Sequence, residues 1–354
     1  HLGSDLLVAA QPVDVSAYEL FLKGRGLVAS RDEQKLMESF DILQEAVAIA
    51  PDYAPAMATL ARGYAVLPWF SALIPSGEAR ENARQWANHA LAIEPDNDEA
   101  LASLSIVLRE ADLDNQGALE LLQRALELNP NSVAAHNFLG DLYVRAGAID
   151  DAMRHETRAA ELDPLGPVHL TDLANVYFLF EDYARVRELS LRALDLSPSF
   201  QNALQHLVDT SYLLGDVALL EAAMARTEAA NVPASRLASA RVQHAVAGND
   251  PDLIQQRMQE AINLFEQGAM SATELAFCAV NIGDFDLAGE FLLQAHARRD
   301  GTWTFPIYIR MPEQAPDSAS WQAFWALPGP AELAQMRRAN GFEAGKIGFG
   351  AGAP

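Results

Sequence analysis

The sequence predicts an all-α solenoid built of paired helices, and two observations lead to this prediction. The first is a phrase that recurs along the chain around Pro51, Pro95, Pro130, Pro164 and Pro198, at spacings of 44, 35, 34 and 34 residues. The second is that apolar residues between these prolines recur at intervals of three and four, which places them on one face of a helix. A period near 34 residues is typical of helix pairs that bury their apolar faces only when the next pair stacks on them.

The unit from 133 to 164 illustrates how each helix pair is built. Tyr143 and Gly140 lie at helical spacing on its first helix, and Ala152 and Ala159 lie on its second. We expect Gly140, Ala152 and Ala159 to be small because two helix backbones approach closely there.

Each repeated proline is expected to end one unit, because a helix cannot continue through a residue that lacks an N–H. The polar residues that follow three of these prolines are the expected N-caps of the next helix: Asp96, Asn131 and Ser199.

The period and these positions resemble the tetratricopeptide repeat. The resemblance implies a right-handed superhelical solenoid, in which we count about eight helical pairs, the first built from about Val15 to Ala50. Residues 15–233 carry the recognisable repeats. Divergent repeat-like helical pairs are expected over 234–300, about 234–247 with 251–267 and about 271–281 with 284–298.

The spacing of 44 residues predicts an insert near 68–77, in a loop between the two helices of the second unit. Trp69, Phe70 and Ile74 are large apolar residues within it. One interpretation is a local plug that packs on neighbouring helices. The other is a lip that contacts a partner, with Trp69 and Phe70 as the contact residues.

The two ends of the chain differ from the repeats. Residues 1–14 are interpreted as a tag remnant or linker, and 345–354 as a flexible, glycine-rich tail. Residues 301–344 are expected to form a C-terminal cap, since the last repeat of a solenoid needs a cover for its apolar edge. The aromatic and aliphatic residues expected to supply that cover are Trp303, Phe305, Ile307, Trp321, Phe324 and Trp325.

Composition excludes several classes of function. The chain of 354 residues carries 48 acidic against 25 basic side chains, a net charge of −23. Such a surface repels phosphate backbones and anionic lipids, so we expect no direct nucleic acid binding by this segment. The most apolar run, 64–74, is too short for a membrane span and contains Pro68. The single cysteine, Cys278, excludes an internal disulfide.

The chain lacks the sequence motifs of the common hydrolases, nucleotide-binding loops and calcium or zinc sites. His136, His169 and His206 recur near the start of successive first helices, where we interpret them as packed helix residues and not as metal ligands. Cys278 is interpreted as a buried, inert thiol. We therefore expect no enzymatic activity, no metal and no cofactor.

The remaining candidate is the concave surface formed by the first helices, where polar, amide and aromatic side chains are offset from the apolar face. Such side chains suit an extended peptide, because amides bind its backbone and aromatics bind its side chains. No lysine falls on this face, which disfavours the lysine-and-asparagine clamp for a C-terminal carboxylate. The predicted groove residues are Arg62, Arg109, Asn137, Asp141, Arg145, Thr171, Asn175, Phe178, Asn202, Gln205, Asp209 and Tyr212.

Longer phrases resemble a particular group of bacterial proteins. They are AYELFLKGRGL from Ala17, ALELLQRALELNPNSVAAH and RAAELDPLGPVHLTDLANVYF. These phrases resemble the C-terminal half of CadC-like winged-helix regulators and the repeats linked to adenylate or guanylate cyclases. That resemblance implies the sensory or docking part of a bacterial signalling or transcription regulator.

Three functions follow from these observations. The first is a non-enzymatic scaffold that binds a protein or peptide in its groove. The second is a small-molecule sensor with a pocket beside Trp69 and Phe70, and the third is an enzyme that uses Trp303, Tyr308 and Arg310. Two copies could also pair through terminal repeats and apolar inserts. The sequence is compatible with either the bacterial cytoplasm or the periplasm.

Overall fold

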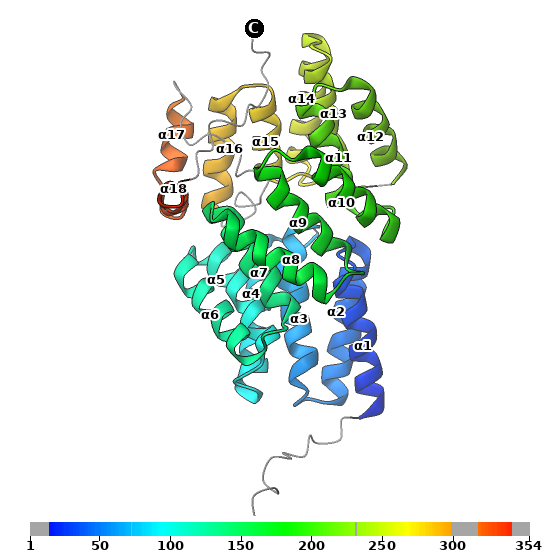
Figure 1. The fold of residues 1–354 in the computed structure, drawn as a ribbon, viewed down its shortest axis with the longest axis vertical. Coiled ribbons are helices and arrows are strands. Elements are labelled where there is room, and N and C mark those ends of the chain that lie inside the picture. Colours follow the sequence, from blue (N-terminus) through cyan, green and yellow to red (C-terminus); the bar gives the residue numbers. More distant parts are fainter. Residues whose placement is uncertain (1–13, 72, 231, 299–317, 342–354) are drawn as a thin grey trace, which may run out of the picture.

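The computed structural model describes residues 14–71, 73–230, 232–298 and 318–341. Within these ranges the chain is helical without strands, and eight antiparallel helix pairs stack in sequence order as a tetratricopeptide-type solenoid (Figure 1). The pairs are α1 (Val15–Ala29) with α2 (Glu33–Ile49), α3 (Ala54–Val66) with α4 (Ser76–Ile93), α5 (Asp98–Ala111) with α6 (Asn115–Leu128), α7 (Val133–Ala146) with α8 (Ile149–Leu162), α9 (Pro167–Leu179) with α10 (Tyr183–Leu196), α11 (Gln201–Leu213) with α12 (Val217–Ala229), α13 (Ala234–Ala247) with α14 (Pro251–Glu266), and α15 (Ala272–Asn281) with α16 (Phe285–Ala297). The predicted fold class is confirmed.

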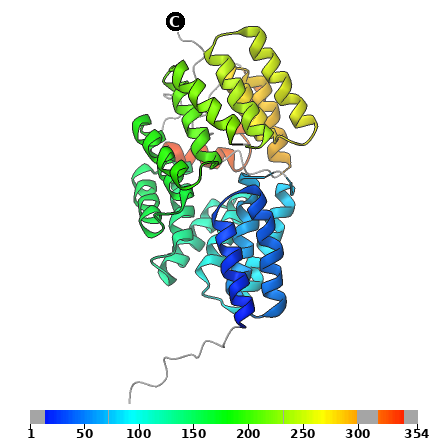
Figure 2. The same cartoon turned by 90° about the vertical axis from the view of Figure 1, so that its right-hand side faces the viewer.

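The stack curves strongly. In Figure 2 the chain passes from the blue N-terminal pairs through the green ones to the yellow and orange pairs, which lie above the blue ones. A hydrogen bond of 3.3 Å from Arg236 Nη2 to the carbonyl oxygen of Trp69 joins these distant parts of the chain. Successive first helices also contact one another, so their inward faces meet in the interior of the superhelix.

The repeated prolines lie in the turns between pairs. Each preceding helix ends two residues before its proline, and the next helix begins three residues after it. The predicted N-caps are therefore wrong. Asn97 caps α5 by accepting from the Ala100 N–H at 2.9 Å, and Ser132 caps α7. At α11 the N-cap position is held by Phe200, whose side chain cannot accept a hydrogen bond. The turn needs one residue more than expected before helical geometry begins.

Gly140 is small for a reason other than the one expected. A Cβ at Gly140 would collide with the side chain of Glu156, which reaches across from α8 and is fully buried. The close approach there is between the α7 backbone and a carboxylate, not between two backbones.

The insert is more ordered than a loop. Leu67–Trp69 forms a 3-10 helix, η1, directly after α3. The rest of the extra length goes into the connection that follows and into α4, which has 18 residues where α6 and α8 have 14. Phe70 is buried in the N-terminal core, so this part of the insert packs as a plug.

Two further helices follow the eighth pair, α17 (Ala319–Trp325) and α18 (Pro330–Ala339). Trp321 and Phe324 of α17 are buried in the core of the last pairs, where Trp321 meets the ring of Phe285 edge to face. This segment covers the end of the solenoid as predicted, and Trp325 packs partly buried beside it. Trp303, Phe305 and Ile307 lie outside the described residues.

None of the helices in the described ranges combines the length and the hydropathy that a bilayer crossing requires.

Candidate functional site

The predicted groove residues face the interior of the superhelix, but few of them reach solvent. Ten of the twelve are buried, and only Arg62 and Asp141 are partly exposed. The reason is that successive first helices pack closely, so that several inward polar side chains reach the next helix. Most of these side chains therefore bond to one another.

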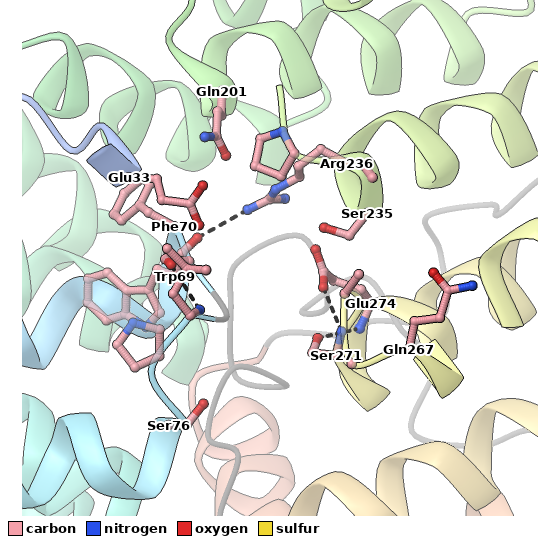
Figure 3. Close-up of a pocket in the computed structure, with 17 residues that line it drawn as sticks. Glu33, Trp69, Phe70, Ser76, Gln201, Ser235, Arg236, Gln267, Ser271 and Glu274 are labelled. Carbon is pink, nitrogen blue, oxygen red and sulfur yellow. Dashed lines mark hydrogen bonds between the residues drawn. The ribbon is translucent and has the colours of Figure 1, made fainter. Parts of the chain in front are cut away.

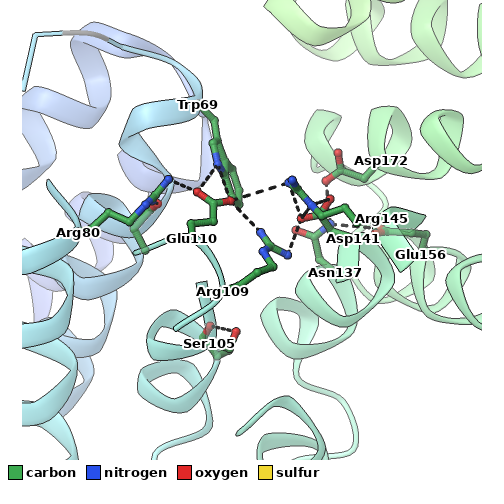
Figure 4. A network of polar contacts seen from close by, with 12 residues as sticks. Trp69, Arg80, Ser105, Arg109, Glu110, Asn137, Asp141, Arg145, Glu156 and Asp172 are labelled. Atoms are coloured by element: carbon green, nitrogen blue, oxygen red, sulfur yellow. Dashed lines mark hydrogen bonds and ion pairs between the residues drawn. The ribbon is translucent and has the colours of Figure 1, made fainter. Parts of the chain in front are cut away.

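Glu110 lies at the centre of a buried ionic network (Figure 4). Its carboxylate accepts from Trp69 Nε1 at 3.1 Å and from Arg109 Nη2 at 3.0 Å, and it pairs with Arg80. Arg145 Nη2 lies 3.9 Å from it. The indole of Trp69 thus has a structural partner, which explains why an aromatic residue of the insert reaches the interior.

Asp141 on α7, in the next repeat, pairs with two of these arginines, Arg109 and Arg145. Its Oδ2 lies 2.8 Å from Arg109 Nη1 and 3.0 Å from Arg145 Nη2. Burial alone would raise the pKa of Asp141, but Arg145 and Arg109 outweigh it and hold that pKa below its usual value. Burial and the charge of Arg145 lower the pKa of Arg109 to about 10. Three guanidinium groups, those of Arg80, Arg109 and Arg145, thus surround two carboxylates, those of Glu110 and Asp141.

Asn137 continues this network toward the next helices. Its Nδ2 donates to Glu156 Oε2 at 3.2 Å and to Asp172 Oδ2 at 2.7 Å. Burial raises the pKa of Glu156 well above its usual value, and the nearby Asp172 adds to the effect. Burial likewise raises the pKa of Asp172 to about 7. Both carboxyl groups accept from the one amide of Asn137, and at Asp172 the charges of Arg31 and Arg145 also favour the ionised form. Burial outweighs these effects, so both pKa values stay raised.

A second polar cluster lies farther along the solenoid. His206 Nε2 is 2.8 Å from Asn175 Oδ1, and burial lowers the pKa of His206 to about 4. Gln205 donates to Asp209 at 2.9 Å, and Gln243 donates to the same carboxylate at 2.7 Å. These amides hold neighbouring repeats together.

The remaining predicted groove residues are placed as follows. Thr171 donates to the Val168 carbonyl at 2.9 Å, and Arg62 Nε lies 3.1 Å from Glu99 Oε1. Phe178 packs on Tyr183 and His206, and Tyr212 is buried in the core of α9 to α13. Asn202 lines a small interior hollow.

A larger hollow, which we call the insert hollow, opens where the two ends of the superhelix face each other (Figure 3). It has a volume of about 440 Å³. Trp69 and Phe70 line it, together with Leu73, which is 67% exposed. Gln201 also lines it, and its buried Oε1 has no hydrogen-bond partner. Other lining residues are Glu33, Ser76, Ser235, Arg236, Gln267, Ser271 and Glu274. The hollow combines apolar area with polar groups of both signs.

Sequence reasoning missed several residues of these networks. Glu110 follows Arg109 directly, but its neighbours offered no sign that it would be buried. Glu156 and Asp172 come from α8 and from the α9 face beside the predicted residue Thr171. The one available signal was Gly140, whose missing side chain makes room for Glu156.

No group of three or more histidine, cysteine, aspartate and glutamate side chains is placed to hold a metal ion within the described ranges. His136 and His155 do approach each other, with 3.0 Å between their Nδ1 atoms. Cys278 is fully buried, and burial raises the pKa of its thiol to about 12, which suppresses the reactive thiolate.

Comparisons with known proteins agree with this architecture. A sequence model of the tetratricopeptide repeat matches residues 111–167. The human IFIT1 dimer with m7Gppp-AAAA aligns with a TM-score of 0.57 at 12% identity, over 83% of this chain and 72% of that chain. The APC/C hetero-tetramer Cut9-Hcn1 gives 0.54 at 14% identity, over 89% of this chain and 55% of that chain. Pseudomonas aeruginosa PilF gives 0.44 at 17% identity, over 59% of this chain and 94% of that chain. At these identities the likeness to the first two structures concerns the fold alone. A search of curated proteins returned no match.

Proposed function

We propose that this chain is a non-enzymatic scaffold that binds an extended peptide segment of a partner protein in the insert hollow. The main support for this proposal is the set of residues that line the insert hollow. Apolar area from the exposed Leu73 lies there beside Gln201, whose buried Oε1 has no hydrogen-bond partner. A peptide N–H would supply the missing donor, and its side chains would cover the apolar area. The tetratricopeptide fold suggests protein or peptide partners in general.

The interior networks explain why binding is assigned to this hollow and not to the whole row of predicted groove residues. Asn137 and Asn175 are buried and already bonded within the chain. A peptide that replaced those bonds would have to break the contacts between repeats. Among the predicted groove residues, Arg62 has a partly exposed guanidinium. The predicted insert residues Trp69 and Phe70 line the insert hollow.

A selection from a random peptide library on the immobilised chain tests the proposal. Leu73→Ala should weaken binding of the selected peptides about fivefold or more, since it removes apolar contact area. Leu165→Ala is the matched control, because Leu165 is 74% exposed on the turn between α8 and α9 and does not line the hollow. Selected peptides that bind both variants as well as the wild-type chain would contradict the assignment.

The volume of the hollow also supports the second candidate, a small-molecule sensor, because small ligands typically occupy pockets of about 300–1,000 Å³. A metabolite library screened by thermal melting separates the two. A compound that raises the melting temperature of the wild-type chain but not that of Leu73→Ala, in the absence of any selected peptide, would favour the sensor.

We further propose that the chain is the sensory or docking part of a bacterial signalling or transcription regulator. The support is the resemblance of the repeat phrases to CadC-like and cyclase-linked modules. A reading frame that continues upstream into a winged-helix or cyclase domain would agree with this proposal, whereas an unrelated upstream domain would contradict it. The pairing of two copies stays a prediction, which light scattering tests.

A further inference from the structure

Arg31 is a buried cation that forms no ion pair with any of the described residues. It lies in the short turn between α1 and α2, at a positive φ of 53°, and is 6% exposed. Its Nε and Nη1 atoms are buried without a hydrogen-bond partner, and no carboxylate in the part of the chain that the structure describes lies within ion-pair distance of its guanidinium. The charges of Asp172 and Glu99 act on Arg31 only from farther away. Burial of an unpaired charge is costly, so a side chain in this state suggests a partner that is not part of the chain.

The other buried arginines of the described residues differ from Arg31 because each has a partner within the chain. Arg80, Arg109 and Arg145 pair with Glu110 or Asp141, and Arg337 donates to a backbone carbonyl. The superhelix thus provides hydrogen-bond or ion-pair partners for interior guanidinium groups elsewhere.

Arg31 lines a second hollow of about 440 Å³, which we call the Arg31 hollow. It lies on the inward side of the first five repeats, between α1, α3 and the starts of α5, α7 and α9. Two further unpartnered nitrogens belong to residues that line it. They are Nη2 of Arg62, whose Nε faces Glu99, and Nδ1 of His169. Donors of Arg31 and Arg62, from two different repeats, therefore border one space, whereas His169 Nδ1 is an acceptor because Nε2 of that ring faces Asp163.

The charged residues around this hollow favour a ligand group with a single negative charge. Asp98, Glu99 and Asp163 line it as well, and each already faces a donor of the chain. These carboxylates would repel a doubly charged phosphate more strongly than a carboxylate. The planar fork of an arginine also matches a carboxylate with two parallel hydrogen bonds. Val133, Ala134 and Val168 supply apolar contact for a short aliphatic body.

We propose that the Arg31 hollow binds the carboxylate group of a ligand, with Arg31 as the principal partner and Arg62 as the second. This site is separate from the insert hollow and does not depend on the peptide binding proposed there. The carboxylate belongs either to a small organic acid or to the C terminus of a peptide, and the test distinguishes these two sources.

The test uses titration calorimetry and thermal melting of the whole chain with four probes. They are acetate, butyrate, and an acetylated trialanine with a free or an amidated C terminus, each compared with chloride at equal ionic strength. We expect at least one free-carboxylate probe to bind at millimolar concentration and to raise the melting temperature. Tighter binding of butyrate than of either peptide assigns the site to small acids. Tighter binding of the free peptide than of the amidated one assigns it to peptide termini.

Arg31→Met keeps the length of the side chain and removes the charge. This variant should lose binding about tenfold or more, and its ligand-free form should melt at a higher temperature than the wild-type chain because an uncompensated charge is removed. Arg25→Met is the matched control, since Arg25 lines the same hollow but is exposed. Leu73→Ala should bind the carboxylate normally, which separates this site from the insert hollow. Absence of binding by all free-carboxylate probes, or equal binding by Arg31→Met, would overturn the proposal.

Discussion

Arg337 donates a hydrogen bond of 3.0 Å from its Nε to the carbonyl oxygen of Arg145, a residue 192 positions earlier in the chain. Asn340 adds a second such bond, 2.8 Å from its Nδ2 to the carbonyl of Ala146. Both bonds run from α18 to the last residues of α7, where backbone carbonyls have no partner inside their own helix. The C-terminal helices therefore do more than cover the last repeat. They join the end of the solenoid to its middle and fix its curvature (Figure 1).

This junction should contribute to the stability of the whole chain. Arg337 is 1% exposed, so Arg337→Ala removes buried contacts and leaves the Arg145 carbonyl without its donor. We expect a loss of about 2–4 kcal/mol in the free energy of unfolding, measured by urea denaturation. Gln335→Ala, at an exposed position of the same helix, should change it little. Equal stability of both variants would show that α18 is only loosely attached.

The Glu110 network should be sensitive to the loss of its central charge. Glu110→Gln keeps the volume but leaves Arg80, Arg109 and Arg145 with insufficient negative charge around them. We expect a destabilisation of about 3–5 kcal/mol, because removing one partner of a buried ionic group leaves the others uncompensated. Asp112→Asn is the control, since Asp112 pairs with Arg84 at the surface, where ion pairs contribute about 0–1 kcal/mol. Chemical denaturation at neutral pH measures both.

Substitution of two glycines by alanine should change the stability of the chain in opposite directions. Gly140→Ala forces the buried Glu156 side chain away from α7 and from its bond with Asn137, which we expect to cost about 1–3 kcal/mol. Gly26→Ala in α1 places its Cβ in open space, so it should stabilise the helix by about 0.5–1 kcal/mol. Thermal melting of the two variants is sufficient. A stabilising Gly140→Ala would contradict the role assigned to that position.

Asp172 should make stability depend on pH. Its folded pKa is raised by burial to about 7 from 3.8, so the folded chain holds a proton that the unfolded chain releases between these values. The contribution of Asp172 to stability is therefore complete below about pH 4 and is lost as the pH rises to about 7.

Asp172→Asn cannot lose this proton and still accepts a hydrogen bond from Asn137. Relative to the wild-type chain, it should gain about 1–3 kcal/mol between pH 5 and 7.5. Buried His206 acts in the opposite direction, since burial lowers its pKa to about 4, but that effect is common to both proteins and cancels in the difference. Asp195→Asn, an exposed control, should show no such gain. Urea denaturation over this pH range measures the difference, and parallel profiles for the wild type and Asp172→Asn would contradict the prediction.

For the predicted groove residues, the sequence could indicate the direction of each side chain but not its partners. Counting along the first helices correctly selected side chains that face the interior, such as Asn137 and Asn175, because the direction of a side chain follows from helical periodicity. The same count could not tell that Gln243 would approach Asp209 or that Glu156 would approach Asn137. These partners lie on other helices, and their distance depends on how tightly the repeats stack.

The sequence by itself determined the helix pairs, their number and the cover at the C-terminal end. These features rest on local signals, namely apolar residues three and four positions apart and prolines that end helices. Only the tertiary structure decided that the inward polar row is largely buried and that α18 bonds to α7. Only the tertiary structure decided that Arg31 forms no ion pair with the described residues. The physical reason is that a small rotation at each interface between repeats accumulates along the superhelix, and that accumulated curvature determines which distant charges meet.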